Sequence, residues 1–300
     1  MKEVSSLNEW RGTILILLTA LISGVAIIVN KFFVVGIDPL LFTAMRAFGI
    51  GIVFFFISFF ISRNWGEKFN KVSWKYLILI GAVGGSFAFW LFFSGLKLTT
   101  GGSAAFIHKT LPVYAMILGY IFLKEKISKG QLVAMGIMLG GLFLLMFSKI
   151  SFEVGIGDLL VLSATILWAF ENTISKRVMM NRESNWVVTF SRMFFGSLIL
   201  FGVIFLTGRT DLLLALTGKQ ILYTVISGGL LFLYVLTWYW GLKYINLSKA
   251  SMILLLSPVI SLILGVAWLG EEVFVLQLVG STLILIGAFF AIRSKSGTRD

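Results

Sequence analysis

The chain has 300 residues, of which 58% are hydrophobic and 13% are charged, and its formal net charge is +12. The apolar share exceeds the roughly 45–50% that is usual in soluble globular domains. It contains no cysteine, so thiolate zinc sites and iron–sulfur clusters are excluded. This composition excludes a water-soluble enzyme and a soluble nucleic-acid-binding domain, and it indicates a protein embedded in a lipid bilayer.

Ten apolar segments fill the chain. Each approaches the roughly 20 residues that an α-helix needs to cross about 30 Å of hydrocarbon. Lipid offers no partners to open backbone N–H and C=O groups, so each segment must be helical. In chain order the predicted spans are 12–33, 40–62, 74–93, 103–123, 131–147, 158–178, 186–206, 221–239, 248–269 and 274–292. The predicted fold class is all-α, a polytopic membrane protein with ten transmembrane helices.

The basic residues predict the orientation of these spans. With the N-terminus placed in the cytoplasm, 17 of the 25 Lys and Arg residues fall on inner segments and 5 on outer segments. This excess is the positive-inside bias of helical membrane proteins. We therefore expect a multi-pass plasma-membrane protein with both termini in the cytoplasm, in which the net charge reports topology and indicates no nucleic-acid partner.

The second half of the chain repeats the first at a displacement of 146 residues. The matching positions include Gly95-Leu96-Lys97 with Gly241-Leu242-Lys243, Arg46 with Arg192, Pro112 with Pro258, and Glu125 with Glu271. Each repeat contains five spans, so the second copy enters the membrane from the opposite face, as in many secondary transporters. The prediction is two inverted five-helix repeats, with domains at 1–149 and 150–300.

These motifs resemble the drug/metabolite transporter superfamily, in its ten-helix branch of tandem EamA domains. The resemblance rests on the paired arginines, the Gly-Leu-Lys segments, the mid-span prolines, and the Leu-x-Glu sequences that end at Glu125 and Glu271. It implies a plasma-membrane carrier of amino acids, metabolites or drugs, often working outward through a central cavity that opens alternately to each side. The pair His108-Lys109 departs from the apolar or small residues of the general pattern.

Five ionisable residues fall inside predicted spans: Arg46, His108, Lys109, Glu171 and Arg192. Such groups cost roughly 2.5–3.5 kcal/mol each at the bilayer centre, so they need partners, water or a function. Glu171 and Arg192 are expected at the same depth near the inner surface. They are interpreted either as a structural ion pair or as a site in which Glu171 is a proton-linked or substrate-binding carboxylate.

Arg46, His108 and Lys109 are expected near the outer surface, without an acidic residue close to them in the spans. Cations around a cavity suit an anionic or zwitterionic solute, which would take a bidentate contact from Arg46 and a point contact from Lys109. The structural alternatives are a neutral or snorkelling Lys109 and an Arg46 that satisfies helix-end carbonyls.

Weaker candidates complete the predicted site. Asn172 would supply directional hydrogen bonds, with a bond back to its own helix as the alternative. Trp90, Tyr114 and Trp168 would stack on an apolar part of the solute, with a position facing another helix or lipid as the alternative. Pro112 and Pro258 each leave helical carbonyls without partners and are interpreted as a hinge or as cavity lining, with simple packing as the alternative.

The predicted function is secondary active transport, as an exporter of a small organic solute, by alternating access around a cavity between the inverted repeats. The expected partners are that solute, the bilayer, and protons as coupling ion; no cofactor or metal is expected. A lipid or lipid-linked sugar flippase of the same fold is the main alternative. A channel and an intramembrane enzyme are the others, and the zinc, serine-elbow and phosphate-loop motifs of enzymes are missing from the sequence.

Overall fold

The computed structural model describes residues 6–65, 73–150, 153–181 and 183–298. The first half of the chain contains α1 (Ser6–Phe33), α2 (Pro39–Trp65), α3 (Trp74–Ala82), η2 (Val83–Phe87), α4 (Ala88–Leu96), α5 (Gly101–Lys109), α6 (Leu111–Phe122), α7 (Lys129–Met146) and η3 (Phe147–Lys149). The second half contains α8 (Ile156–Met180), α9 (Asn185–Leu206), α10 (Asp211–Leu214), α11 (Gly218–Tyr244), α12 (Leu247–Ile253), η4 (Leu254–Leu256), α13 (Ser257–Leu269) and α14 (Val275–Arg293).

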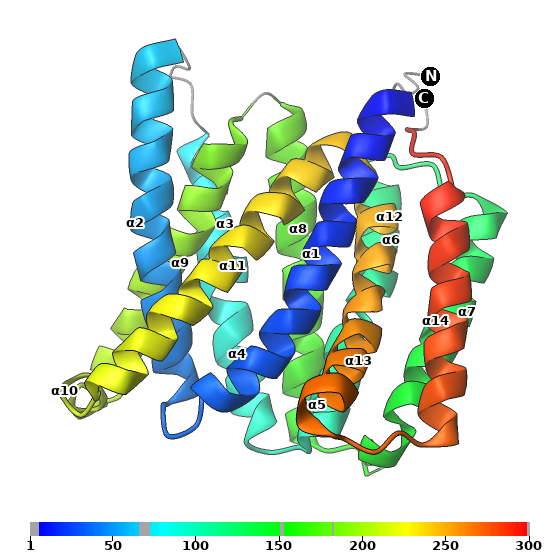
Figure 1. Cartoon of the computed structure of the whole chain (residues 1–300). Helices are drawn as coiled ribbons and strands as arrows, with labels where there is room; N and C mark the ends of the chain where they lie inside the picture. Colours follow the sequence, from blue (N-terminus) through cyan, green and yellow to red (C-terminus); the bar gives the residue numbers. More distant parts are fainter. Residues whose placement is uncertain (1–5, 66–72, 151–152, 182, 299–300) are drawn as a thin grey trace.

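Within the described residues, nine helical segments are long and apolar enough to cross a membrane. The tenth predicted span is α8, a helix of 25 residues. It carries Asp158, Glu171, Lys176 and Arg177 and is therefore more polar than the others. It runs through the bundle among the other helices (Figure 1), and Asp158, Glu171 and Lys176 are buried there, whereas Arg177 near its end is exposed. The prediction of an all-α membrane protein with ten spans is confirmed.

The helix boundaries reproduce the repeat seen in the sequence. The helices α2, α5 and α7 begin at Pro39, Gly101 and Lys129, and their counterparts α9, α12 and α14 begin 146 residues later. Figure 1 shows α1 leaving the end that carries both chain termini, whereas α8 runs towards that end. The two five-helix units are therefore inverted relative to each other, as predicted.

Helices of the two halves pack against each other throughout the bundle. The closest cross-half pairs are α2 with α9, α1 with α11, and α7 with α14. The two ends of the chain also meet, because the backbone N–H of Ser296 donates to Glu9 Oε1 at 2.6 Å. The division into domains at 1–149 and 150–300 stays a prediction, since each half buries its apolar faces against the other.

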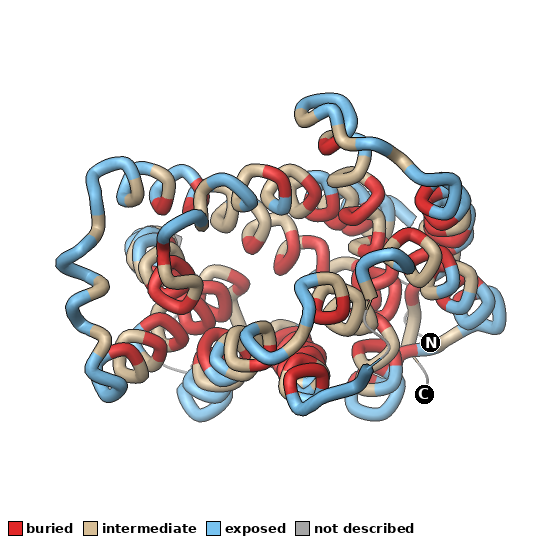
Figure 2. Tube along the Cα trace, turned by 90° about the horizontal axis from the view of Figure 1, so that it is seen from below, coloured by how far each residue is buried: buried red, intermediate tan, exposed pale blue. Residues whose placement is uncertain are grey.

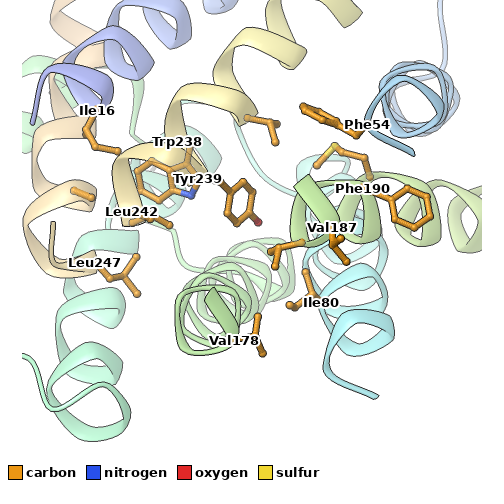
Figure 3. Close-up of a cluster of buried hydrophobic side chains, with 14 of the residues drawn as sticks. Ile16, Phe54, Ile80, Val178, Val187, Phe190, Trp238, Tyr239, Leu242 and Leu247 are labelled. Atoms are coloured by element: carbon orange, nitrogen blue, oxygen red, sulfur yellow. The ribbon is translucent and has the colours of Figure 1, made fainter. Parts of the chain in front are cut away.

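The burial pattern is that of a protein surrounded by lipid. Exposed residues face outward and buried residues face the inside of the bundle (Figure 2). Many exposed side chains are large and apolar, including Phe56, Phe60, Trp268 and Phe290, as expected where the surrounding solvent is hydrocarbon. Figure 3 shows the largest buried cluster, in which Trp238 and Tyr239 of α11 lie among side chains of several other helices.

Both mid-span prolines coincide with a break in the helix. Pro112 lies in the first turn of α6, directly after the break between α5 and α6 at Thr110. Pro258 lies in the first turn of α13, after the short η4 segment that follows α12. A proline ring clashes with the preceding turn and lacks an N–H, so the chain restarts a helix at symmetry-related points.

The start of α7 follows the sequence rule for helix capping. Ser128 and Gln131 form a capping box at the start of α7. Several basic residues that were counted as inner, among them Lys68, Lys71 and Arg182, lie outside the described residues.

Candidate functional site

A cavity of about 270 Å³ lies between the two halves of the chain. Its walls come from α2, η2, α4, α5 and α6 of the first half and from α8, α9, α11, α12 and η4 of the second. A cavity of this size, lined mainly by apolar side chains with a few polar groups, is typical of a site for a small molecule.

The structure brings seven of the eleven predicted site residues to this cavity. They are Arg46, His108, Lys109, Pro112, Trp168, Asn172 and Arg192. The lining residues that the structure describes include three basic side chains, those of Arg46, Lys109 and Arg192, and neither aspartate nor glutamate. The cavity is therefore strongly cationic.

Four predicted residues lie elsewhere. Trp90 lines a second, smaller cavity of about 130 Å³ together with Lys97 and Arg209. Tyr114 packs against the main hydrophobic cluster, and Pro258 is buried in α13 without lining the cavity wall. Glu171 is fully buried behind the wall.

Lys109 connects the two broken helices. It is the last residue of α5, and its Nζ donates a hydrogen bond to Ser257 Oγ at 2.8 Å. Ser257 begins α13 and precedes Pro258. Lys109 lies at the helix break of the first half and Ser257 at that of the second. The ammonium group of Lys109 is therefore bonded to a neutral hydroxyl of the other half.

Arg46 also has a neutral partner. Its Nη1 donates to Ser227 Oγ at 2.9 Å, and Ser227 in turn donates to Asn30 Oδ1 at 2.5 Å. The guanidinium carbon lies 4.2 Å from the centre of the Phe42 ring, a distance at which a cation is attracted to the ring face. Among the described residues, none accepts a hydrogen bond from Arg46 Nε. The charge is positioned without a counter-ion.

The charge of Arg192, the repeat counterpart of Arg46, is compensated by the carboxylate of Glu171. Its Nη2 lies 3.5 Å from Glu171 Oε2, and Tyr239 and Ser175 both donate to Glu171 Oε1, at 2.7 and 2.6 Å. The position equivalent to Glu171 in the first half is Val25. The structure thus contains the ion pair that one interpretation of the sequence predicted. Among the described residues no equivalent carboxylate pairs with Arg46, so the charge of Arg46 has no counter-ion there.

A distorted turn in the third span makes room for this network. Residues Val83–Phe87 form a π-helical segment, a feature that often occurs at functional sites. The carbonyl of Gly84 accepts from Trp168 Nε1 at 3.0 Å, and a Cβ at Gly84 would lie 2.2 Å from Glu171 Cγ. Only glycine permits this approach of Glu171 to the helix.

Asn172 lies beside Glu171 on α8 and is held from two sides. Its Nδ2 donates to the carbonyl of Trp168 at 2.7 Å, and its Oδ1 accepts from Trp238 Nε1 at 2.8 Å. These bonds hold the amide that lines the cavity in one orientation.

Sequence reasoning missed several residues that complete the site. Ser227 and Ser257 accept hydrogen bonds from Arg46 and Lys109, and Tyr239 and Ser175 donate to Oε1 of Glu171. The spacing of Ser175 four residues after Glu171 was a usable signal, because such residues are neighbours on a helix. The serines on α11 and α13 carry no such signal, since only packing brings them to Arg46 and Lys109.

Two inverted five-helix units that enclose a cavity with basic side chains between them define the class of this protein as a helical membrane transporter. The model of the EamA-like transporter family matches residues 10–147 and again residues 155–293. The chain belongs to the EamA-like transporter family, as its motifs predicted.

Similar proteins agree with this assignment. An uncharacterized transporter of Archaeoglobus fulgidus is 26% identical over 295 residues, which cover 96% of this chain and 100% of that protein. The uncharacterized transporter YoaV of Bacillus subtilis is 27% identical over 91% of this chain and 94% of its own length. A solved crystal structure, at 19% identity, has a TM-score of 0.79 over 93% of this chain and 96% of its own, which shows the fold.

We predict that Glu171→Gln lowers the thermal stability of the purified protein strongly. The substitution keeps the shape but leaves Arg192 buried without a counter-charge, which costs about 3–5 kcal/mol. The double variant Glu171→Leu with Arg192→Met should recover much of the loss, because it removes both charges. Thermal unfolding in detergent measures this, with exposed Lys219→Gln as control. An unchanged unfolding midpoint for Glu171→Gln would contradict a structural ion pair.

Proposed function

We propose that this protein is a secondary active carrier of the plasma membrane that moves a small organic anion by alternating access, with both chain termini in the cytoplasm. Arg46, Lys109 and Arg192 form its cationic binding site, with His108, Trp168 and Asn172 beside them. Export is the direction that we propose, since the family resemblance of the motifs implies it.

The observation that carries this proposal is the uncompensated charge of Arg46 and Lys109. Both cations line the cavity and bond only to serine hydroxyls among the described residues. A buried charge without a counter-ion is costly in a medium of low dielectric constant. A carboxylate or phosphate group of a solute would supply the missing negative charge, with Arg46 as a planar donor and Lys109 as a point charge.

The inverted halves suggest how access alternates. At the end of the bundle that carries the termini, Glu125 accepts hydrogen bonds from the backbone N–H groups of Leu247 and Ser248 at 2.6 and 3.1 Å. These residues open α12 and are fully buried. Lys176 Nζ lies 3.6 Å from the same carboxylate. The first turn of α12 is thus docked onto Glu125, and this end is closed.

The equivalent residues at the other end have the same local structure but are not docked. The backbone N–H groups of Glu125 and Glu271 donate to equivalent glycine carbonyls, at 3.0 and 3.2 Å. The side chain of Glu271, however, is 35% exposed and pairs with Lys31 at 2.7 Å. This hydrogen bond from Lys31 lowers the pKa of Glu271. Gly101, the counterpart of Leu247, is exposed.

If the first half adopts the conformation of the second, and the second that of the first, the protein reaches a second state that is open at the opposite end. In that state Glu271 leaves Lys31 and caps the first turn of α5, and Glu125 releases α12. A carboxylate at a helix N-terminus is stabilised by the free N–H groups and by the helix dipole. We propose that Glu125 and Glu271 are alternating gates, and that the structure described here is the state open to the outside.

The gate proposal predicts opposite effects of Glu125→Gln and Glu271→Gln. Because the chain contains no cysteine, Leu231→Cys in the cavity wall provides a single reporter. Losing a helix cap costs typically about 1 kcal/mol, so Glu125→Gln should shift the equilibrium about fivefold away from the state open to the outside. Labelling by an impermeant maleimide from the outside should fall accordingly. Glu271→Gln should increase outside labelling. A shift in the same direction for both variants would contradict alternating gates.

A carrier, unlike a channel or an enzyme, exchanges solute across the membrane. We expect the organic acid that stabilises the protein best in a thermal-shift screen to be exchanged by proteoliposomes, with uptake accelerated by the same solute on the opposite side. Lys109→Met should reduce this exchange at least about tenfold, the effect of losing a charge-assisted hydrogen bond, whereas exposed Lys219→Met should not. Full exchange by Lys109→Met would remove Lys109 from the site, and uptake without such acceleration would favour a channel.

We propose that His108, rather than Glu171, binds the proton that is coupled to transport. His108 is the single histidine of the chain and lines the cavity, whereas Glu171 is fully buried in its ion pair. An imposed pH gradient should therefore drive accumulation of the solute in proteoliposomes. His108→Gln should make the accumulation independent of the gradient. Accumulation that responds equally to the gradient in both proteins would exclude His108 as the coupling residue.

A lipid or lipid-linked sugar flippase is the main alternative with this fold. The cavity of about 270 Å³ suits a solute of metabolite size better than a lipid with its acyl chains. Transport of a fluorescent phospholipid in the exchange assay, without exchange of organic acids, would favour the flippase.

A further inference from the structure

The cavity holds a group of aromatic side chains as well as cations. Phe89, Phe92 and Phe93 of α4, together with Trp168 of α8 and His108 of α5, all line it. Their rings are in mutual contact: Trp168 lies 5.0 Å from Phe89, 5.5 Å from Phe92 and 4.7 Å from His108, measured between ring centres. These edge-to-face and tilted arrangements are favourable for aromatic pairs.

The aromatic group presents carbon surface to the cavity. The one polar atom of Trp168, Nε1, is already bonded to the carbonyl of Gly84. The His108 ring packs edge-to-face against both Phe92 and Trp168, and its Nδ1 is buried, with no described hydrogen-bond partner. Phe92 and Phe93 are themselves in edge-to-face contact at 5.5 Å. This part of the cavity therefore suits a flat apolar body and offers little to a hydrophilic one.

The cavity is also unfavourable for an ammonium group. Its described lining residues include no carboxylate, and Glu171 is sealed behind Arg192. The amide oxygen of Asn172 already accepts from Trp238. A zwitterion such as an amino acid would bring a positive charge close to Arg46 and Lys109 without compensation, and this repulsion disfavours it.

We propose that the solute is an aromatic organic anion, whose ring lies on Phe92, Trp168 and His108 and whose negative group binds Arg46 and Lys109. This rests on the proposed carrier function and narrows its substrate class: small hydrophilic anions lack the apolar body, and aromatic amino acids carry a charge that the site repels. Phe92 and Trp168 are then specificity-determining residues.

The test compares three probes that differ in one group at a time: 3-phenylpropionate, propionate and phenylalanine. Their binding to the purified full-length protein in detergent is measured by isothermal titration calorimetry. Burying the ring against aromatic side chains should make 3-phenylpropionate bind about tenfold to a hundredfold more tightly than propionate. Phenylalanine, which adds an ammonium group, should bind at least about tenfold more weakly than 3-phenylpropionate.

Phe92→Leu separates a direct contact from a general effect on the fold. It should weaken 3-phenylpropionate about tenfold and change propionate binding less than about twofold, since only the ring contact is lost. Phe290→Leu, an exposed position on α14, is the matched control and should change neither. Equal losses for the two acids in Phe92→Leu would overturn the proposal.

The other outcomes separate the aromatic-anion proposal from the proposed carrier function on which it rests. Propionate or phenylalanine binding as tightly as 3-phenylpropionate would overturn the aromatic-anion proposal. Failure of all three probes to bind, in a protein that exchanges another organic anion, would overturn it as well and leave the carrier function standing. Absence of exchange for every solute in the proteoliposome screen would instead count against the carrier itself.

Discussion

The constraint on which the rest of this structure depends is the cost of placing charge inside a bundle surrounded by lipid. Three basic side chains line the central cavity, and one carboxylate, Glu171, lies behind its wall and pairs with Arg192. The neighbours of Glu171 are arranged to hold it there: Tyr239 and Ser175 donate to it, and Gly84 gives it room. Arg46 and Lys109 have serine partners among the described residues, and the proposed anion site rests on this difference between the halves.

The same constraint explains why the irregular helix geometry is concentrated around the cavity. The breaks before Pro112 and Pro258 and the π-turn at Val83–Phe87 leave backbone groups that must find partners inside protein. One such partner is the cavity residue Trp168, which donates to the carbonyl of Gly84. Irregular backbone, buried charge and aromatic side chains therefore occur together, where the two inverted halves meet, and the resulting cavity combines a cationic part with an apolar part.

Much of the site could be anticipated because charge in a hydrophobic span is easy to recognise. Arg46, His108, Lys109 and Arg192 line the cavity, and the Glu171–Arg192 pair followed from their equal depth. The aromatic predictions were less successful: Trp168 lines the cavity, whereas Trp90 and Tyr114 do not. In this chain 15% of the residues are aromatic, and a ring that faces lipid or a neighbouring helix has the same sequence signature as one that faces a cavity.

The sequence by itself determined the ten helices, the inverted repeat, the family and the five ionisable residues inside the spans, because hydrophobic length, residue order and ionisable groups are local properties of the chain. Only the tertiary structure decided which charges are compensated, that Ser227 and Ser257 hold the two free cations, and that Glu125 is docked while Glu271 is not. Apart from the Glu171–Arg192 pair, those contacts join residues more than a hundred positions apart, and their distances depend on how the two halves pack against each other.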